Sequence, residues 1–261
     1  MRTRKQPISL EERKKIQLEM LVEIDAFCRE HNIKYMLAFG TLLGAIRHKG
    51  YIPWDDDMDI SMPLEDITRF KKEFKSEKLR FCDIDTENNY EWLFPRIVYM
   101  PTYNKAGLIH KAYGVNIDLY PTIEVDPSKI NTTPIFNQLI KMQIKYSKLI
   151  KMRRRMIKIL PITTIPGFRS FIKKYRDNYL NSLEHAGGGA YHCIAGSLFD
   201  YDTHTFPFDP FEKMIEVEFE GLLFKAPAKF SEYLTHHYGD YMKLPPEEQR
   251  HPYHIAKYFW K

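Results

Sequence analysis

A chain of 261 residues has room for one large domain or two small ones. Its 44% hydrophobic content supports a core, and no stretch reaches the roughly 18 uninterrupted apolar residues of a membrane span. The net charge of +5 conceals an asymmetry, because residues 127–176 hold thirteen Lys and Arg and no acid, while the remainder has 26 basic against 34 acidic side chains. That segment is predicted to face an anionic partner.

The N-terminus and the cysteines favour a cytoplasmic protein. Residues 1–15 are charged and lack the apolar region of a signal peptide. The three cysteines form no CxxC pair and leave one over, so we expect buried, reduced thiols and no disulfide framework at Cys28, Cys82 and Cys193.

The first elements alternate between helix and strand. Ser9 and Glu12 form a capping box for a helix that extends to His31. A short strand is expected over 34–39, ended by Gly40, and a helix over 41–48, ended by Gly50. An acidic strand over 54–62 follows, and Pro63 opens a helix over 65–74.

Further strands are expected over 79–84, 96–100 and 115–120, which gives an α+β layer whose sheet carries the chemistry. Residues 128–185 have a mostly helical pattern, and a hairpin over 215–225 precedes a helix over 228–237. We divide the chain into a catalytic core, 1–126, a basic helical segment, 127–185, and an elaboration packed on the core, 186–261.

Residues 39–59, FGTLLGAIRHKGYIPWDDDMD, join a small-residue turn, a cationic pair and a run of carboxylates. On a strand, Asp57 and Asp59 stand side by side, and such a pair needs a cation between its charges. Hard oxygen ligands suit Mg²⁺ or Mn²⁺. Asp56 points to the opposite face and is expected to be structural, while Asp55 stays open between metal ligand and solvated acid.

A third carboxylate is expected to hold a second ion or to take a proton. Asp118 fits, because it interrupts an apolar strand in which it shares a face with Asn116. The other DxD pair, Asp83 and Asp85, runs into a polar turn, and we interpret it as structural.

Two features before the acids suit an anionic donor. If Gly40 and Thr41 open a helix, they offer backbone N–H groups to a phosphate. Arg47 can meet phosphate oxygens with two hydrogen bonds, Lys49 is expected to be solvated, and His48 is undecided.

The stretch GTLLGAIRHKGYIPWDDDMDI resembles the signature of the LicD family of phosphocholine transferases and fukutin-type ribitol-phosphate transferases. The strand with Asp118, the Glu220-Gly221 turn and the stretch YGDYMKLPP from Tyr238 agree in order. The chain departs from the family at Asp118-Leu-Tyr-Pro-Thr-Ile-Glu124, where the acid after Pro121 is shifted.

The resemblance implies a nucleotidyltransferase-like mixed sheet flanked by helices, with a largely helical C-terminal elaboration. It implies a metal-dependent transfer of a phospho-alcohol, most commonly phosphocholine from CDP-choline. The acceptor would be a sugar hydroxyl of a surface glycan such as lipopolysaccharide or teichoic acid, or of its lipid-linked precursor. By position, Gly40 and Thr41 resemble the phosphate turn, Asp57 and Asp59 the metal pair, and Asp118 the third acid.

Two other functions stay open. A nucleotidyltransferase would add NMP from an NTP to a small molecule or RNA with the same turn and acids. A non-catalytic glycan-assembly partner would keep the fold, but it has no need for costly clustered acids.

Residues 139–160 form an amphipathic basic helix pattern that suits either peripheral contact with the inner face of the plasma membrane or packing in the core. No nucleic acid is expected, because this segment has one Tyr and no stacking platform. The histidines of the tail match no standard zinc spacing: His236, His237, His251 and His254.

Overall fold

The computed structural model describes residues 6–87, 90, 92, 94–106, 110–126, 170, 173–174, 177–178, 189–193, 204–252 and 257–261. The contacts divide the chain into two units, one of residues 1–81, 96–119 and 210–261, the other of residues 82–95 and 120–209. The predicted basic segment 127–185 and the helix at 139–160 lie almost wholly outside the described residues, so the three-part division stays a prediction.

The first helix is confirmed where the sequence predicts it. Helix α1, Leu10–Glu30, is capped by Ser9, whose hydroxyl accepts from the backbone N–H of Glu12 at 3.1 Å. The other half of the capping box is replaced, because the Glu12 carboxylate accepts from the Trp260 indole. The inward face of α1 is apolar and buried: Ile16, Met20, Leu21, Ile24 and Cys28.

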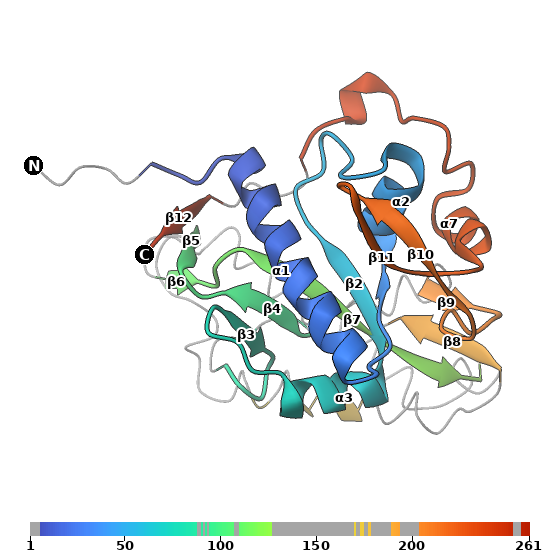
Figure 1. Cartoon of the computed structure of the whole chain (residues 1–261), viewed down its shortest axis with the longest axis horizontal. Helices are drawn as coiled ribbons and strands as arrows, with labels where there is room; N and C mark the ends of the chain where they lie inside the picture. Colours follow the sequence, from blue (N-terminus) through green and yellow to red (C-terminus); the bar gives the residue numbers. More distant parts are fainter. Residues whose placement is uncertain are drawn as a thin grey trace, which may run out of the picture. The chain divides into compact units, whose positions relative to one another are not determined.

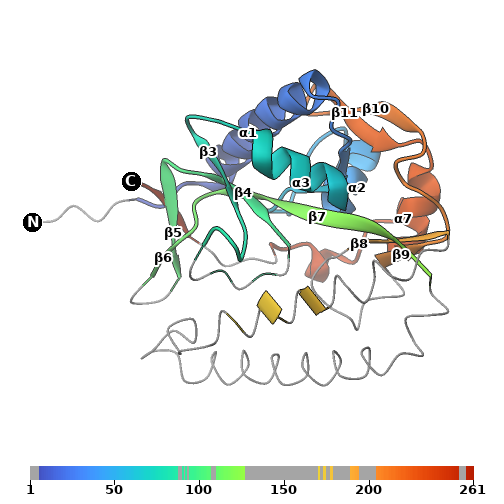
Figure 2. The same ribbon diagram turned by 90° about the horizontal axis from the view of Figure 1, so that it is seen from below.

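The sheet of the first unit has the strand order β1-β2-β7-β4-β3. Its strands are β1, Met36–Leu37, β2, Asp59–Pro63, β3, Leu79–Cys82, β4, Arg96–Tyr99, and the first part of β7, Asn116–Val125. Helices α1 and α3, Leu64–Glu73, lie on the same face of this sheet (Figures 1 and 2). Their apolar sides and the face of the sheet that they cover form the core.

Two predicted boundaries next to the acids are wrong. Helix α2, Phe39–His48, begins before Gly40, so this glycine lies in its first turn and does not end a strand. Residues 54–58 form a loop, and β2 begins only at Asp59. The loop imitates a strand in sequence because Ile52 and Met58 are buried, and burial alone does not require a strand.

The C-terminal residues return to the first unit. Strands β10, Met214–Phe219, and β11, Leu222–Pro227, form the predicted hairpin, and α7, Phe230–Tyr238, is the predicted helix. The hairpin contacts β1, and α2 contacts β2, β10 and α7. A short 3₁₀ helix, Glu247–Gln249, follows. Strand β12, Tyr258–Trp260, pairs with β5, Thr102–Ala106. Strand β5 also pairs with β6, His110–Ala112.

In the second unit, the last part of β7 pairs antiparallel with β8, Ala190–Cys193, and β8 pairs with β9, Thr205–Phe206. Asp83 caps a tight turn by accepting from the N–H groups of Asp85 and Thr86. This confirms the structural interpretation of the second DxD pair. The three cysteines are buried, as expected.

The fold is therefore α+β, with a mixed sheet flanked by helices, as in nucleotidyltransferase-like proteins. Among the helices that the structure describes, none combines the length and the apolar composition needed to cross a membrane.

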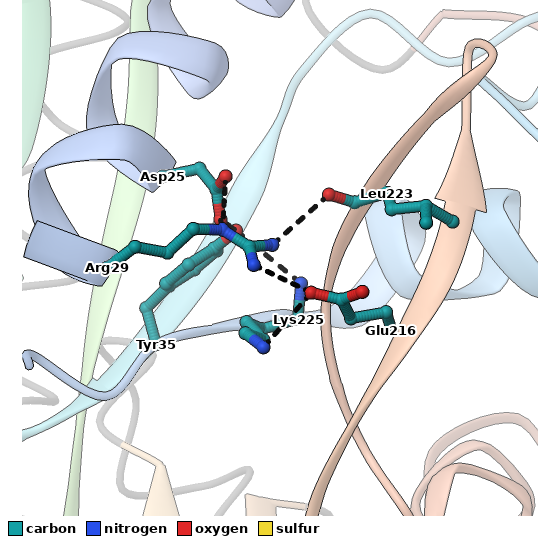
Figure 3. A network of polar contacts seen from close by, with 6 residues as sticks. All are labelled: Asp25, Arg29, Tyr35, Glu216, Leu223 and Lys225. Carbon is teal, nitrogen blue, oxygen red and sulfur yellow. Dashed lines mark hydrogen bonds and ion pairs between the residues drawn. The ribbon is translucent and has the colours of Figure 1, made fainter.

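A polar network joins α1, Tyr35 just before β1, and the hairpin (Figure 3). The Tyr35 hydroxyl, on a residue only 2% exposed, donates to Asp25 at 2.5 Å and accepts from the backbone N–H of Lys225 at 3.4 Å. Arg29 pairs with Asp25 at 2.7 Å and with Glu216 at 2.6 Å. The network ties the C-terminal hairpin to the first helix.

Replacing Tyr35 by Phe should lower the free energy of unfolding by about 1–2 kcal/mol, because a buried donor and acceptor is removed. Urea denaturation measures it. The matched control is Tyr241→Phe, whose hydroxyl makes one exposed contact, to Ser231 at 3.2 Å. Equal losses in both variants would show that the network does not stabilise the fold.

Candidate active site

Four carboxylates gather where α2, the loop before β2 and the centre of the sheet meet. Asp55, Asp56 and Asp57 lie in the loop, and each offers an oxygen within 4.8 Å of the others. Asp59 opens β2 and is 7% exposed. The structure thus groups the predicted acids, although Asp55 and Asp57 come from a loop.

The first carboxyl of the group titrates abnormally. Burial, and then the charge of Asp57, raise the pKa of Asp55 to about 7. The hydrogen bond between the carboxyl groups of Asp55 and Asp57 also raises this pKa, so Asp55 keeps a proton near neutral pH.

Asp59 lies deeper. Burial, followed by the charges of Asp57, Asp118 and Asp55, raises the pKa of Asp59 well above its usual value, against a smaller opposite effect of Arg96. Its Oδ1 atom is buried and has no hydrogen-bond partner among the described residues. A buried carboxylate oxygen in this state calls for a proton or a cation.

Asp118 is paired. Arg96 binds it with two contacts, Nε to Oδ1 at 2.8 Å and Nη2 to Oδ2 at 2.9 Å, and Asn116 donates to Oδ1 at 2.5 Å. The shared face of Asn116 and Asp118 is thus confirmed. Arg96 lies opposite Asp118 in the β4–β7 register. Sequence reasoning missed Arg96, because the register of two strands is not visible in either one alone.

The predicted phosphate turn touches the acids. Gly40 lies so close to Asp55 that a Cβ atom built on it would be 2.7 Å from Asp55 Oδ2. The Thr41 hydroxyl accepts from the backbone N–H of Asp59 at 2.8 Å and thereby fixes α2 to the start of β2. These contacts give both residues a place in the site, while phosphate binding by them stays a prediction.

Replacing Gly40 by Ala should displace the Asp55 carboxylate, because the methyl group would overlap Oδ2. We expect weaker Mn²⁺ binding, by roughly 10–100-fold, as for residues that orient metal ligands. Isothermal calorimetry measures the affinity. The control is Ala45→Gly in the same helix, a buried site that lies away from the acids in sequence, and equal affinities for the two variants would contradict the expectation.

Arg47 contacts the C-terminal part of the chain. Its Nη1 donates to the carbonyl oxygen of Tyr241 at 2.7 Å and to that of Lys243 at 3.4 Å, and its Nε donates to His48 at 2.9 Å. Burial, and then Arg47, lower the pKa of His48. Lys49 is exposed, as expected. Phosphate binding by Arg47 stays a prediction, since its guanidinium already holds this loop.

Tyr238 lies near the site, although the sequence motifs did not indicate a role for it there. Burial, and then the charges of Asp59, Asp55 and Asp57, raise its pKa, although the residue is 43% exposed. The effect of three carboxylates on this pKa indicates that the Tyr238 hydroxyl lies near the acids. Its helix, α7, contacts α2, and His237 packs on Phe39 with the rings 4.9 Å apart.

The site residues fit a divalent cation. The donor set consists of hard carboxylate oxygens, three of them mutually within 4.8 Å, and Asp59 adds a buried oxygen without a partner among the described residues. Asp57 and Asp59 would hold the ion, with Asp55 beside them. No such cluster forms among the tail histidines that the structure describes, and His254 lies outside them.

Similarity to known proteins covers this site. A family model described as LicD/FKTN/FKRP, nucleotidyltransferase domain, matches residues 32–165. The lipopolysaccharide cholinephosphotransferase LicD of Haemophilus influenzae is 26% identical over 265 aligned residues, which cover 96% of this chain and 97% of that protein. An uncharacterized protein of Rickettsia typhi is 41% identical over 64 residues, 24% of this chain and 21% of its own.

Proposed function

The chain belongs to the LicD/FKTN/FKRP nucleotidyltransferase family, and we propose that it is a transferase that moves phosphocholine from CDP-choline to a sugar hydroxyl of a lipopolysaccharide-type glycan or its lipid-linked precursor. The observation that carries this proposal is the cluster of carboxylates in which Asp59 is buried and Asp55 and Asp57 are half-buried, in a chain similar along nearly its whole length to a cholinephosphotransferase. Costly buried acids without full compensation are typical of catalytic sites.

In this proposal, Asp57 and Asp59 hold Mg²⁺ or Mn²⁺. When bound, such an ion supplies positive charge for the donor pyrophosphate. The first turn of α2, with Gly40 and Thr41, and the guanidinium of Arg47 face the donor phosphates. Asp118 takes the proton of the sugar hydroxyl. The oxygen of that hydroxyl bonds to the phosphorus of phosphocholine, the bond from this phosphorus to the CMP oxygen breaks, and CMP leaves. Most of the rate enhancement then comes from positioning and charge compensation.

The test is calorimetric titration of CDP-choline and CDP-ribitol, with CTP as the control donor, in Mg²⁺ and in EDTA. Binding of CDP-choline that requires the metal supports the proposal. Binding of CDP-ribitol alone would change the transferred alcohol. Binding of CTP alone would favour a nucleotidyltransferase that adds NMP, which shares the acids and the turn.

The role of Asp118 can be separated from that of its partner. If Asp118 takes the proton, Asp118→Asn should lower the turnover number by roughly 10²–10⁴-fold and keep CDP-choline affinity. Arg96→Met should cost less, because it removes a neighbour and leaves the carboxylate. Turnover and affinity are measured for both. Equal losses in the two variants would make Asp118 a structural anchor for Arg96.

The location remains part of the proposal. A lipid-linked acceptor would suit an enzyme in the cytoplasm at the inner face of the plasma membrane, with residues 139–160 as the contact. Residues 139–160 lie outside the described part of the chain. Binding to vesicles with and without anionic lipid, by the whole chain, tests this contact.

A further inference from the structure

The loop of residues 49–58, which carries Asp55, Asp56 and Asp57, is held from two directions. One set of contacts comes from the beginning of α1 and the other from the turn of the β10–β11 hairpin. These two elements are separated by almost the whole chain, and both lie in the first unit. Residues 53–58 belong to no helix or strand, and their backbone bonds include a turn from the Asp55 N–H to the Ile52 carbonyl and a bond from the Asp118 N–H to the Met58 carbonyl. The course of the loop between these bonds depends on side-chain contacts.

The contact from α1 is a buried ion pair. Arg13 Nη2 lies 2.7 Å from Asp56 Oδ2, and the two side chains are 7% and 2% exposed. The Arg13 guanidinium also lies 5.2 Å from the centre of the Tyr258 ring. Asp56 therefore turns into the protein, away from solvent, and its neighbours Asp55 and Asp57 are fixed on either side of it.

The next residue of α1 extends this contact to the backbone. The Lys14 ammonium donates to the carbonyl oxygens of Ile52 at 3.2 Å and Pro53 at 3.3 Å. In return, the Tyr51 hydroxyl donates to the carbonyl oxygen of Lys14 at 3.0 Å. The first half of the loop is thus bonded to α1 through three backbone groups.

The contact from the hairpin is made at its turn. Glu220 Oε1 accepts from the backbone N–H of Tyr51 at 2.9 Å, and the backbone N–H of Glu220 donates to Lys49 at 2.8 Å. Glu220 and Gly221 adopt φ values of 53° and 76°, which form the tight turn that presents this carboxylate. Gly50 leaves room for this carboxylate, because a Cβ atom at this position would lie 2.1 Å from Glu220 Oε1 and would displace it.

We propose that Arg13 and Glu220 are positioning residues of the metal site: they hold the loop so that Asp55 and Asp57 stay together beside Asp59. Adjacent carboxylates repel one another, and a loop without anchors would separate them. The ion pair of Arg13 also compensates the charge of Asp56, which leaves the carboxyl groups of Asp55, Asp57 and Asp59 to a cation. This inference rests on the proposed function for the identity of the site, but the anchoring itself can be tested without substrate.

The experiment compares matched pairs of variants. Arg13→Met removes the ion pair to the loop, and Arg29→Met removes ion pairs of the same helix that do not reach it. Glu220→Ala removes the loop contact of the hairpin, and Glu216→Ala removes the contact of the same hairpin with Arg29 and Lys225. Glu220→Gln keeps an acceptor oxygen for Tyr51. Amide hydrogen exchange over residues 49–58 and Mn²⁺ affinity are measured for each folded variant.

Arg13→Met and Glu220→Ala should speed exchange in residues 49–58 and weaken Mn²⁺ binding by roughly 10–100-fold, as for residues that orient metal ligands. Arg29→Met and Glu216→Ala should change neither, and Glu220→Gln should recover most of the affinity. Unchanged exchange in the loop variants, or equal changes in the control variants, would overturn the proposal.

Two further arms guard against ambiguous results. Arg13→Met is expected to lose stability because it removes one partner of a buried ion pair, whereas Arg13→Met with Asp56→Asn removes both charges and should regain stability. Low Mn²⁺ affinity in this stable double variant supports positioning, and wild-type affinity overturns it. A wild-type protein that binds no Mn²⁺ would refute the metal in the proposed function, and loop exchange then decides the anchoring by itself.

Discussion

Replacing Asp57 by Asn is expected to lower the rate of phosphocholine transfer by roughly a thousand-fold or more, the effect of several kcal/mol of lost charge stabilisation. Asp57 contributes to the raised pKa of both Asp55 and Asp59, which places its charge at the centre of the group. The amide keeps the size of the side chain but provides a much weaker ligand. Transfer from CDP-choline is measured together with Mn²⁺ affinity.

The matched control is Asp85→Asn, which changes an acid of the other DxD pair. Asp85 lies in a turn of the second unit and pairs with Lys173 at 2.8 Å. We expect wild-type transfer from this variant. If Asp57→Asn remains folded by circular dichroism and transfers phosphocholine at the wild-type rate, the proposed site is wrong.

The second large effect is on the free energy of unfolding. Without divalent ions and near neutral pH, the Asp55→Asn variant should be more stable than the wild type. Burial, and then Asp57, raise the pKa of Asp55 from its ordinary 3.8 to about 7, so the folded protein keeps a proton that the unfolded chain loses. The stabilisation from this proton is complete below the unfolded pKa and is lost as pH rises to about 7. Asn has no such loss.

Thermal unfolding in EDTA from pH 4 to pH 8 measures this difference. The midpoint of Asp55→Asn should rise relative to that of the wild type between about pH 4 and pH 7 and then level off. Excess Mg²⁺ should reduce the gap, because bound cation compensates the ionised carboxylates of the wild type. A gap that does not change with pH would show that Asp55 is ionised in the folded protein throughout.

Local signals predicted the elements whose causes are local. The Ser9 cap, the apolar spacing of α1 and the Glu220-Gly221 turn of the hairpin depend on residues within a few positions of one another, and all three are confirmed. The strand predicted over 54–62 is wrong for residues 54–58, because β2 begins at Asp59. Its alternation of apolar and acidic residues comes from a loop that α1 and the hairpin hold against the core.

The candidate site was foreseen in part. Sequence reasoning selected the acids that the structure brings together, because carboxylates within an apolar stretch need a counter-ion. It missed Arg96, Arg13 and Tyr238, because each reaches the acids only through the tertiary fold. The contacts of Arg47 with the carbonyl groups of Tyr241 and Lys243 were missed for the same reason, and phosphate binding by Arg47 stays a prediction.

The two-sided hold on the acidic loop has a consequence for how the protein is made. Arg13 and Asp55 leave the ribosome early, but Glu220, Tyr238 and the carbonyl groups that bind Arg47 are synthesised last. A nascent chain that ends before Pro210 therefore contains all the carboxylates of the candidate site but lacks the hairpin, which is one of the two anchors of the acidic loop. If the chain binds a cation as proposed, full affinity should appear only when translation is nearly complete.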